Sequence, residues 1–220
     1  KLQYNLEYNL IYQFLKQVFH PKKRKRNKKS ETIIIDTSSI KIDLNMWRNR
    51  YKIGKSDKKY RYSYGHSIGY YVGFKLILAI NQDYELLGFE IHKDSPNDSK
   101  ILIPFIEKLF RARIIKFEDI IVCDKGFTSK ANYQTIINRF NLVPLIYPRK
   151  NTNIEKIIRD INPPLDIFLA KKYNMIIWKR LVNNFKKLIA NWEYFRPIRS
   201  NIEDYFNISK NRVEEKRKEK

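Results

Sequence analysis

The stretch TIIID, residues 32–36, places a β-branched run directly before an aspartate. A second stretch, DIIVCD at residues 119–124, repeats this arrangement and ends at Asp124. Short Ile and Val runs are typical of buried strands, so each aspartate is expected where a strand ends. Ligand sites of open α/β sheets gather at the carboxyl ends of strands, where Asp36 and Asp124 would converge if their strands are parallel neighbours. Either aspartate taken singly also fits a turn or a helix cap.

Outward from these strands, the periodicity alternates between strand and helix. Strands are predicted over residues 68–80, 84–91, 119–123 and 142–146, with a turn at 81–83. Helices are predicted over residues 3–19, 129–139 and 176–192. A further helix is predicted from about residue 95, with a buried stripe formed by Ile101, Leu102, Phe105, Ile106 and Leu109. The last helix is predicted from about residue 198, after a break at Pro197. This order predicts an α/β domain with a mixed sheet flanked by helices.

Composition divides the chain into three parts. Residues 1–30 read as the end of a helical segment followed by a basic linker, in which seven of the eight residues 22–29 are Lys or Arg. Residues 31–210 carry the alternating pattern and form the expected domain. Residues 211–220 are almost wholly charged and are expected to fray or remain disordered.

The charge balance points to a polyanionic partner. The 220 residues include 45 Lys and Arg against 23 Asp and Glu, a formal net charge of +22. An AT-rich genome would raise Lys but does not explain the shortage of acids. Nucleic acid is favoured over a membrane because no apolar run approaches the ~20 residues of a spanning helix. The single cysteine, Cys123, reads as a core side chain and fits a reducing cytoplasm.

A third acid lies on a helix near the end of the chain. On a helical wheel with Arg199 at zero, Glu203 falls near 40° and Lys210 near 20°. Ile202 and Phe206 fall on the adjacent face, so this helix can pack on the core while aiming the charges at its edge. The alternative is an ordinary i, i+4 pair on a solvated face, worth only ~0.3–0.5 kcal/mol.

Together these motifs resemble the insertion-sequence transposases with an RNase H-like catalytic core. That family carries two aspartates at strand ends and a helix reading Y-x2-R-x3-E-x6-K, whose last three positions match Arg199, Glu203 and Lys210. The Tyr position is Arg196 here, a departure, although Tyr194 lies two residues earlier. Four further segments resemble family motifs in the same order: Asp36-Thr-Ser-Ser, Gly73-Phe-Lys75-Leu, Asp124-Lys-Gly-Phe and Pro148-Arg-Lys-Asn151.

The resemblance implies a DNA transposase that cuts and rejoins DNA. Asp36, Asp124 and Glu203 would be both the catalytic residues and the ligands of Mg²⁺ or Mn²⁺, with two ions the expected number. Four basic residues would contact DNA phosphates: Arg199, Lys210, Arg149 and Lys150. Double-stranded DNA, as element ends and target, is the implied partner. The active complex is expected to be a homodimer in the nucleoid of a prokaryotic cell.

Two other functions remain open from the sequence. One is a decayed transposase that folds and binds DNA but does not react. The other is a basic RNA-binding or ribosome-associated protein, which would have no need of convergent carboxylates. The histidines (His20, His66 and His92) lack ligand spacing, and four further acids (Asp43, Asp57, Asp94 and Asp98) occupy turn-like contexts that suit loops or caps. Basic and aromatic residues alternate over 47–64, which suits either DNA contact or an exposed hairpin.

Overall fold

The computed structural model describes the backbone of residues 2–18, 21, 30–41, 63–65, 69–93, 95–163 and 172–218, and side chains within 8–17, 21, 30–41, 69–93, 95–163 and 175–208. Several predictions fall outside these residues: the basic run 22–29, the side chains of 47–64 and Lys210, and the residues His20, His66, Asp43, Asp57 and Asp94.

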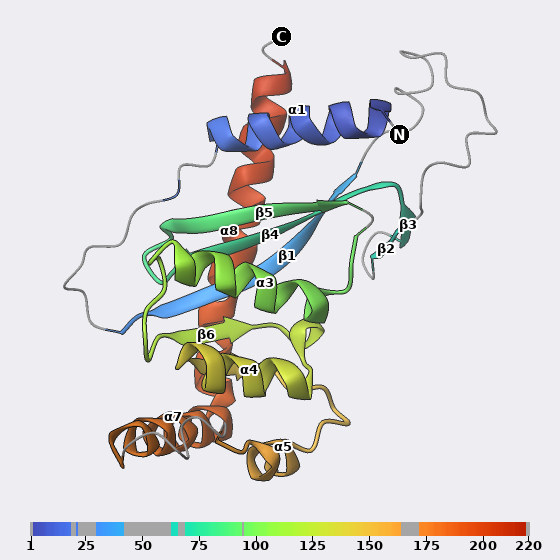
Figure 1. Ribbon diagram of the computed structural model, residues 1–220. Coiled ribbons are helices and arrows are strands. Elements are labelled where there is room, and N and C mark those ends of the chain that lie inside the picture. Colours follow the sequence, from blue (N-terminus) through green and yellow to red (C-terminus); the bar gives the residue numbers. More distant parts are fainter. Residues whose placement is uncertain are drawn as a thin grey trace.

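A five-stranded mixed sheet forms the centre of the domain (Figure 1). Its strands are β1 (Thr32–Lys41), β4 (Gly73–Asn81), β5 (Leu86–Lys93), β6 (Ile120–Cys123) and β7 (Val143–Ile146), in the spatial order β5-β4-β1-β6-β7. Strand β4 pairs antiparallel with both β1 and β5, whereas β6 and β7 run parallel to β1. This is the RNase H-like mixed sheet that was expected. Strands β2 (Ser63–Gly65) and β3 (Gly69–Tyr71) pair separately.

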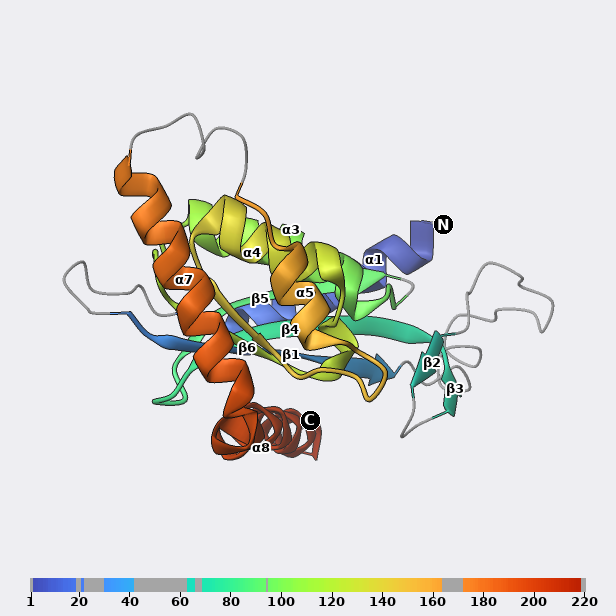
Figure 2. The same ribbon diagram turned by 90° about the horizontal axis from the view of Figure 1, so that it is seen from below.

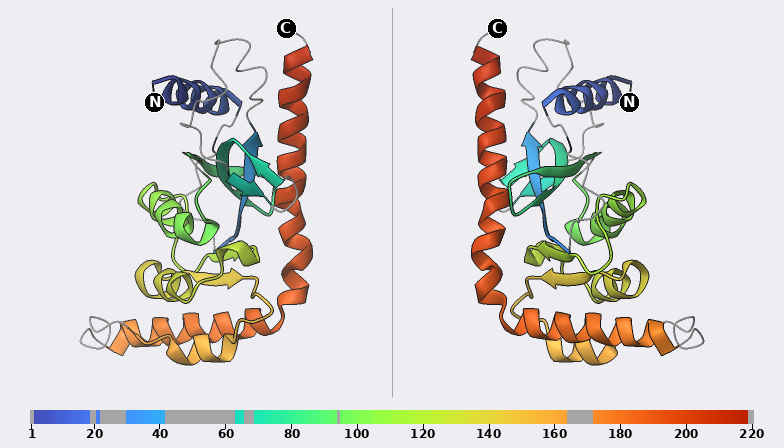
Figure 3. Two further views of the ribbon diagram at one scale, coloured as in Figure 1. Left: turned by 90° about the vertical axis from the view of Figure 1, so that its right-hand side faces the viewer. Right: turned by 90° about the vertical axis from the view of Figure 1, so that its left-hand side faces the viewer.

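Helices cover both faces of this sheet (Figure 3). One face carries α3 (Asp98–Arg111), α4 (Lys130–Phe140), α5 (Ile154–Asp160) and α7 (Lys172–Ala190), and the other carries α8 (Trp192–Lys218). Helix α1 (Leu2–Val18) packs through Tyr8 against Phe74 of β4. Seen from below, the sheet separates α8 from α3 and α4 (Figure 2).

Strand alternation divides the core into two layers. Ile33, Ile35 and Cys123 are completely buried beneath α3, α4 and α7. Ile34 and Val122, which point to the opposite face, are buried with Trp192, Ile202 and Phe206 of α8. Since side chains in a strand alternate with a period of two, this division determines which side of the sheet every polar residue of β1 and β6 faces. No helix among the described residues has the length and apolarity needed to cross a membrane.

Two strand boundaries differ from the prediction. Strand β1 does not end at residue 35, so Asp36 lies inside it: β4 stays paired with β1 as far as Lys41, whereas the pairing with β6 ends at Cys123. Asp36 thus lies where the parallel partner ends. The strand predicted over 68–80 is divided at Val72 into β3 and β4.

The helical end of the chain also differs. The break falls at Asn191 instead of Pro197, and Pro197 lies inside α8. Pro197 lies in the second turn of α8, where it removes one backbone hydrogen bond near the helix start. Residues 211–218, expected to fray, continue α8 to Lys218, and the short helix α5 was not predicted.

Candidate catalytic site

Strand alternation brings Asp36 and Asp124 to the same face of the sheet. Ile35 is the register partner of Cys123, the last parallel pair between β1 and β6. Asp36 and Asp124 follow directly, two residues beyond Ile34 and Val122, whose side chains are buried under α8. Both carboxylates therefore project towards α8, at the carboxyl ends of the parallel pairing. The expected convergence follows from this register.

Helix α8 brings Arg199 and Glu203 to this edge because two apolar residues fix its rotation. Ile202 is completely buried and Phe206 is 6% exposed, both in the layer beneath α8. Arg199 and Glu203 lie on the neighbouring face, as the helical wheel predicts, and half of the Glu203 side chain is exposed. The position of α8 against β1 therefore decides where the third acid lies.

One guanidinium joins two of the three acids. Arg199 Nη1 lies 3.0 Å from Asp124 Oδ1, and Arg199 Nη2 lies 2.6 Å from Glu203 Oε1. Because both nitrogens belong to the same planar group, these two carboxylate oxygens are at most about 8 Å apart. The structure thus brings Asp124 and Glu203 together, with Arg199 between them.

The surroundings of the Asp36 carboxyl group disfavour its ionised form. Asp36 is partly buried, and its Oδ1 accepts a hydrogen bond of 2.8 Å from the backbone N–H of Thr37. Burial, reinforced by the nearby charge of Asp124, raises the pKa of Asp36 to about 7, against the lowering effects of that hydrogen bond and of Arg199. Burial therefore disfavours the ionised form of the Asp36 carboxyl at neutral pH.

The donor set suits a hard divalent cation, although the side chains are not arranged as a preformed metal site. No three Asp, Glu, His or Cys residues of the described part of the chain stand close enough to hold a metal ion as they are. Carboxylate oxygens are nevertheless the ligands that Mg²⁺ and Mn²⁺ prefer. A cation could replace the Arg199 guanidinium between Asp124 and Glu203 and supply the positive charge that Asp36 lacks.

The basic loop after β7 lies against the loop that carries Asp124. Arg149 and Lys150 are both exposed, and Arg149 Nε donates to the backbone carbonyl of Lys125, at 3.2 Å. This hydrogen bond holds Arg149 beside the segment that follows Asp124, with its side chain exposed to solvent. Lys210 lies in α8, but its side chain is outside the described residues. Arg196, at the position of the family tyrosine, pairs with Glu193 at 3.5 Å.

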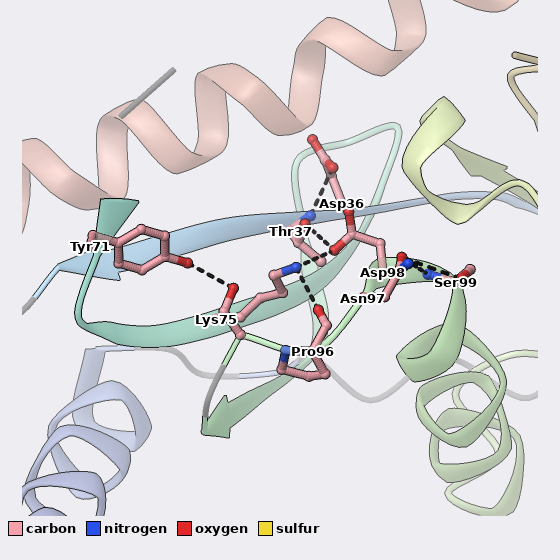
Figure 4. A network of polar contacts seen from close by, with 9 residues as sticks. Asp36, Thr37, Tyr71, Lys75, Pro96, Asn97, Asp98 and Ser99 are labelled. Atoms are coloured by element: carbon pink, nitrogen blue, oxygen red, sulfur yellow. Dashed lines mark hydrogen bonds and ion pairs between the residues drawn. The ribbon is translucent and has the colours of Figure 1, made fainter. Parts of the chain in front are cut away.

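A fourth acid, Asp98, also lies near Asp36. Its sequence context predicts a loop or cap position, and Asp98 lies in the first turn of α3, directly after the capping residue Asn97. Its Oδ1 accepts hydrogen bonds from Lys75 Nζ at 2.8 Å and from Thr37 Oγ1 at 3.0 Å (Figure 4). Lys75 belongs to the Gly73-Phe-Lys75-Leu motif, but no local feature of the sequence connects it with Asp98. Cys123, by contrast, is a completely buried core side chain, as expected.

A mixed sheet with acids gathered where its parallel strands end is the arrangement of an RNase H-like nucleic-acid-processing domain. Residues 27–220 match the family described as Transposase DDE domain, so the chain belongs to this family of transposases, which act on DNA. No curated protein matches the chain. Among solved structures, a piggyBac transposase synaptic complex with hairpin DNA is similar, at 12% identity and a TM-score of 0.36. That match covers 66% of this chain and 27% of the piggyBac chain.

Proposed function

We propose that this transposase domain cleaves and rejoins the DNA strands of an insertion sequence, with Asp36, Asp124 and Glu203 as the catalytic metal ligands. The observation that carries the proposal is the ion-paired arrangement at one edge of the sheet. Arg199 contacts both Asp124 and Glu203, and Asp36 lies close enough to Asp124 for their charges to interact. In the proposal, acids from β1, from the loop after β6 and from α8 would together hold the cations at this edge of the sheet.

The residue types fit phosphoryl transfer. When bound by these carboxylates, two divalent cations, Mg²⁺ or Mn²⁺, supply activation of the attacking oxygen and stabilisation of the leaving oxygen. Arg199, once released from its two carboxylates, presents a planar fork that matches a phosphate in bidentate fashion. In the proposal, Lys210 offers a point charge to the same strand, and Arg149 and Lys150 grip the backbone beside Asp124.

The proposed partners are the ends of the element and a target duplex. A net charge of +22 favours contact with DNA backbones over a long stretch. Because an element has two ends, we infer that two copies of the chain act together, one at each end. We place this activity at the nucleoid in the cytoplasm of a prokaryotic cell, in line with double-stranded DNA as the substrate.

The experiment compares nicking of supercoiled plasmid DNA in Mn²⁺ by the unmodified protein and by Asp124→Asn. Asn keeps the size of Asp and one oxygen but removes the charge that holds a cation. Because both the attacking and the leaving oxygen depend on the metal ions, the rate of nicking should fall by roughly several orders of magnitude. DNA binding should persist. Asp160→Asn is the matched control, since Asp160 of α5 pairs with Lys130 of α4 at 2.7 Å and is not one of the proposed ligands.

Two results would count against the proposal. Equal nicking by the unmodified protein and Asp124→Asn would mean that Asp124 is not a ligand. Binding of DNA without nicking by either protein would favour the alternative, a transposase remnant that only binds DNA.

A further inference from the structure

Asp98 links three separate segments around the candidate site. Its Oδ1 accepts from Thr37 Oγ1 on β1 and from Lys75 Nζ on β4. Lys75 Nζ also donates to the carbonyl of Pro96, at 2.6 Å, just before α3. Lys75 is well shielded, with only 14% of its side chain exposed, so both of its bonds are made in a largely water-excluded place. Such charge-assisted bonds are stronger than neutral ones.

Thr37 connects this network with Asp36 on the other side of the same strand. Asp36 faces α8, and the next residue, Thr37, faces α3, because neighbouring side chains of a strand point to opposite faces. The backbone N–H of Thr37 donates to Asp36, while its hydroxyl donates to Asp98 (Figure 4). A shift of Thr37 would therefore move Asp36 as well.

The loop that follows Asp124 is packed directly on Asp98. A Cβ added to Gly126 would lie 2.7 Å from Asp98 Oδ2, so only glycine fits without displacing that carboxylate. Asn132 gives a second connection, since its side-chain amide donates both to the Ser99 carbonyl of α3 and to the Phe127 carbonyl. Asp98 thus contacts both segments that carry the two aspartates of the site.

The charge of Asp98 is already compensated. Its ion pair with Lys75 is 2.8 Å long, and the same oxygen accepts from Thr37. A cation binding to Asp98 Oδ1 would have to displace the ammonium of Lys75, which is held by a second bond to the Pro96 carbonyl. The geometry is that of an internal brace and differs from Asp124, whose partner Arg199 is shared with a second acid on a different element.

We propose that Asp98, braced by Lys75, is a positioning residue that sets the separation of Asp36 and Asp124 through Thr37 and Gly126. The proposal rests on the proposed function of those two aspartates. The hydrogen bond from Thr37 holds β1, and the close approach of Gly126 holds the loop after β6. Asp98 positions the two aspartates through these neighbours and is not itself placed against DNA or the reacting phosphate.

Thr37→Val and Thr37→Ser form the matched pair that tests this inference. Valine keeps the shape of threonine and removes the hydroxyl, whereas serine keeps the hydroxyl and removes a methyl group. Mn²⁺ affinity, measured by electron paramagnetic resonance of free Mn²⁺, and the rate of plasmid nicking should fall roughly 10- to 100-fold in Thr37→Val, as for other groups that orient metal ligands. Thr37→Ser should stay within about twofold of the unmodified protein, and DNA affinity should be unchanged in both.

The outcomes separate positioning from folding and from the proposed function. Equal loss in the Val and Ser variants, or wild-type Mn²⁺ affinity in Thr37→Val, would overturn the inference. If the unmodified protein neither binds Mn²⁺ nor nicks DNA, the proposed function fails. In that case, crystal structures of the two variants still test whether Asp98 positions the aspartates. The distance between Asp36 and Asp124 should change in Thr37→Val and stay the same in Thr37→Ser. An unchanged distance in both variants would refute the positioning role of Asp98.

Discussion

Replacing Asp36 by Asn should stabilise the metal-free protein at alkaline pH. Burial and the charge of Asp124 raise the pKa of Asp36 from 3.8 to about 7, while Asp98 adds to this effect and Arg199 opposes it. Between about pH 4 and 7, the folded state holds a proton that the unfolded state has released, so stability falls as pH rises through this window. Asn carries no charge at any pH and keeps an oxygen for the N–H of Thr37.

The size of the effect follows from the shift. A change in the pKa of Asp36 from 3.8 to about 7 corresponds to at most about 4 kcal/mol, at 1.36 kcal/mol per unit. Asp36 is only partly buried, so screening by water reduces this figure, and about 2–4 kcal/mol is expected above pH 7. Below about pH 4 the carboxyl is protonated in both states, and the gain should vanish.

The assay is urea unfolding in EDTA from pH 4 to 8. The free energy of unfolding of Asp36→Asn should exceed that of the unmodified protein by an amount that grows with pH and levels off above 7. Asp160→Asn serves as the control, because the hydrogen bond from Lys130 lowers the pKa of Asp160 below its usual value. The carboxyl of Asp160 is then ionised in both states over most of this range, so its variant should show no growth in stability with pH. A difference between Asp36→Asn and the unmodified protein that is independent of pH, or negative at pH 8, would refute the reasoning.

Three further outcomes are expected. Arg199→Gln should bind Mn²⁺ roughly two- to tenfold more tightly in the absence of DNA, since two partly exposed ion pairs no longer compete with the cation. The same variant should bind DNA more weakly in a filter-binding assay. An unchanged Mn²⁺ affinity would contradict the idea that Arg199 occupies the cation position. Phe206→Ala removes a side chain of α8 that packs on the sheet, so it should lower the free energy of unfolding by about 3–5 kcal/mol. It should also reduce the rate of nicking, because Glu203 is then held less firmly. An unchanged rate of nicking would show that packing of α8 on the sheet is not needed for the reaction. DNA affinity should fall with salt at a log–log slope near −0.9 per phosphate contacted, and Arg149→Gln should reduce the slope by about one contact; a flat titration would remove the argument from net charge.

The parts of the fold that sequence predicts best are those governed by local periodicity. The TIIID stretch predicts a buried strand, and Ile33, Ile34 and Ile35 are indeed completely buried. The helical wheel places Ile202 on the core face and Glu203 beside it, and the structure agrees. In both places one repeating pattern of apolar residues determines orientation.

Features that depend on a distant partner were not predictable in this way. The length of β1 depends on β4, which keeps Lys41 paired with Gly73 after β6 has ended. Pro197 favours a helix end locally, yet the chain turns at Asn191 and buries Trp192 against the sheet. Lys75 and Asp98 meet only when β4 and α3 pack together, so the brace next to Asp36 has no local signal.

The most direct test of the central claim is anomalous diffraction from crystals of the protein soaked in Mn²⁺. The account predicts Mn²⁺ peaks, up to the two that the proposed chemistry uses, within about 2.5 Å of carboxylate oxygens of Asp36, Asp124 and Glu203. Arg199 should then have moved away from Asp124 and Glu203. A peak bound by other residues, or no peak while Arg199 still bridges Asp124 and Glu203 at saturating Mn²⁺, would contradict it.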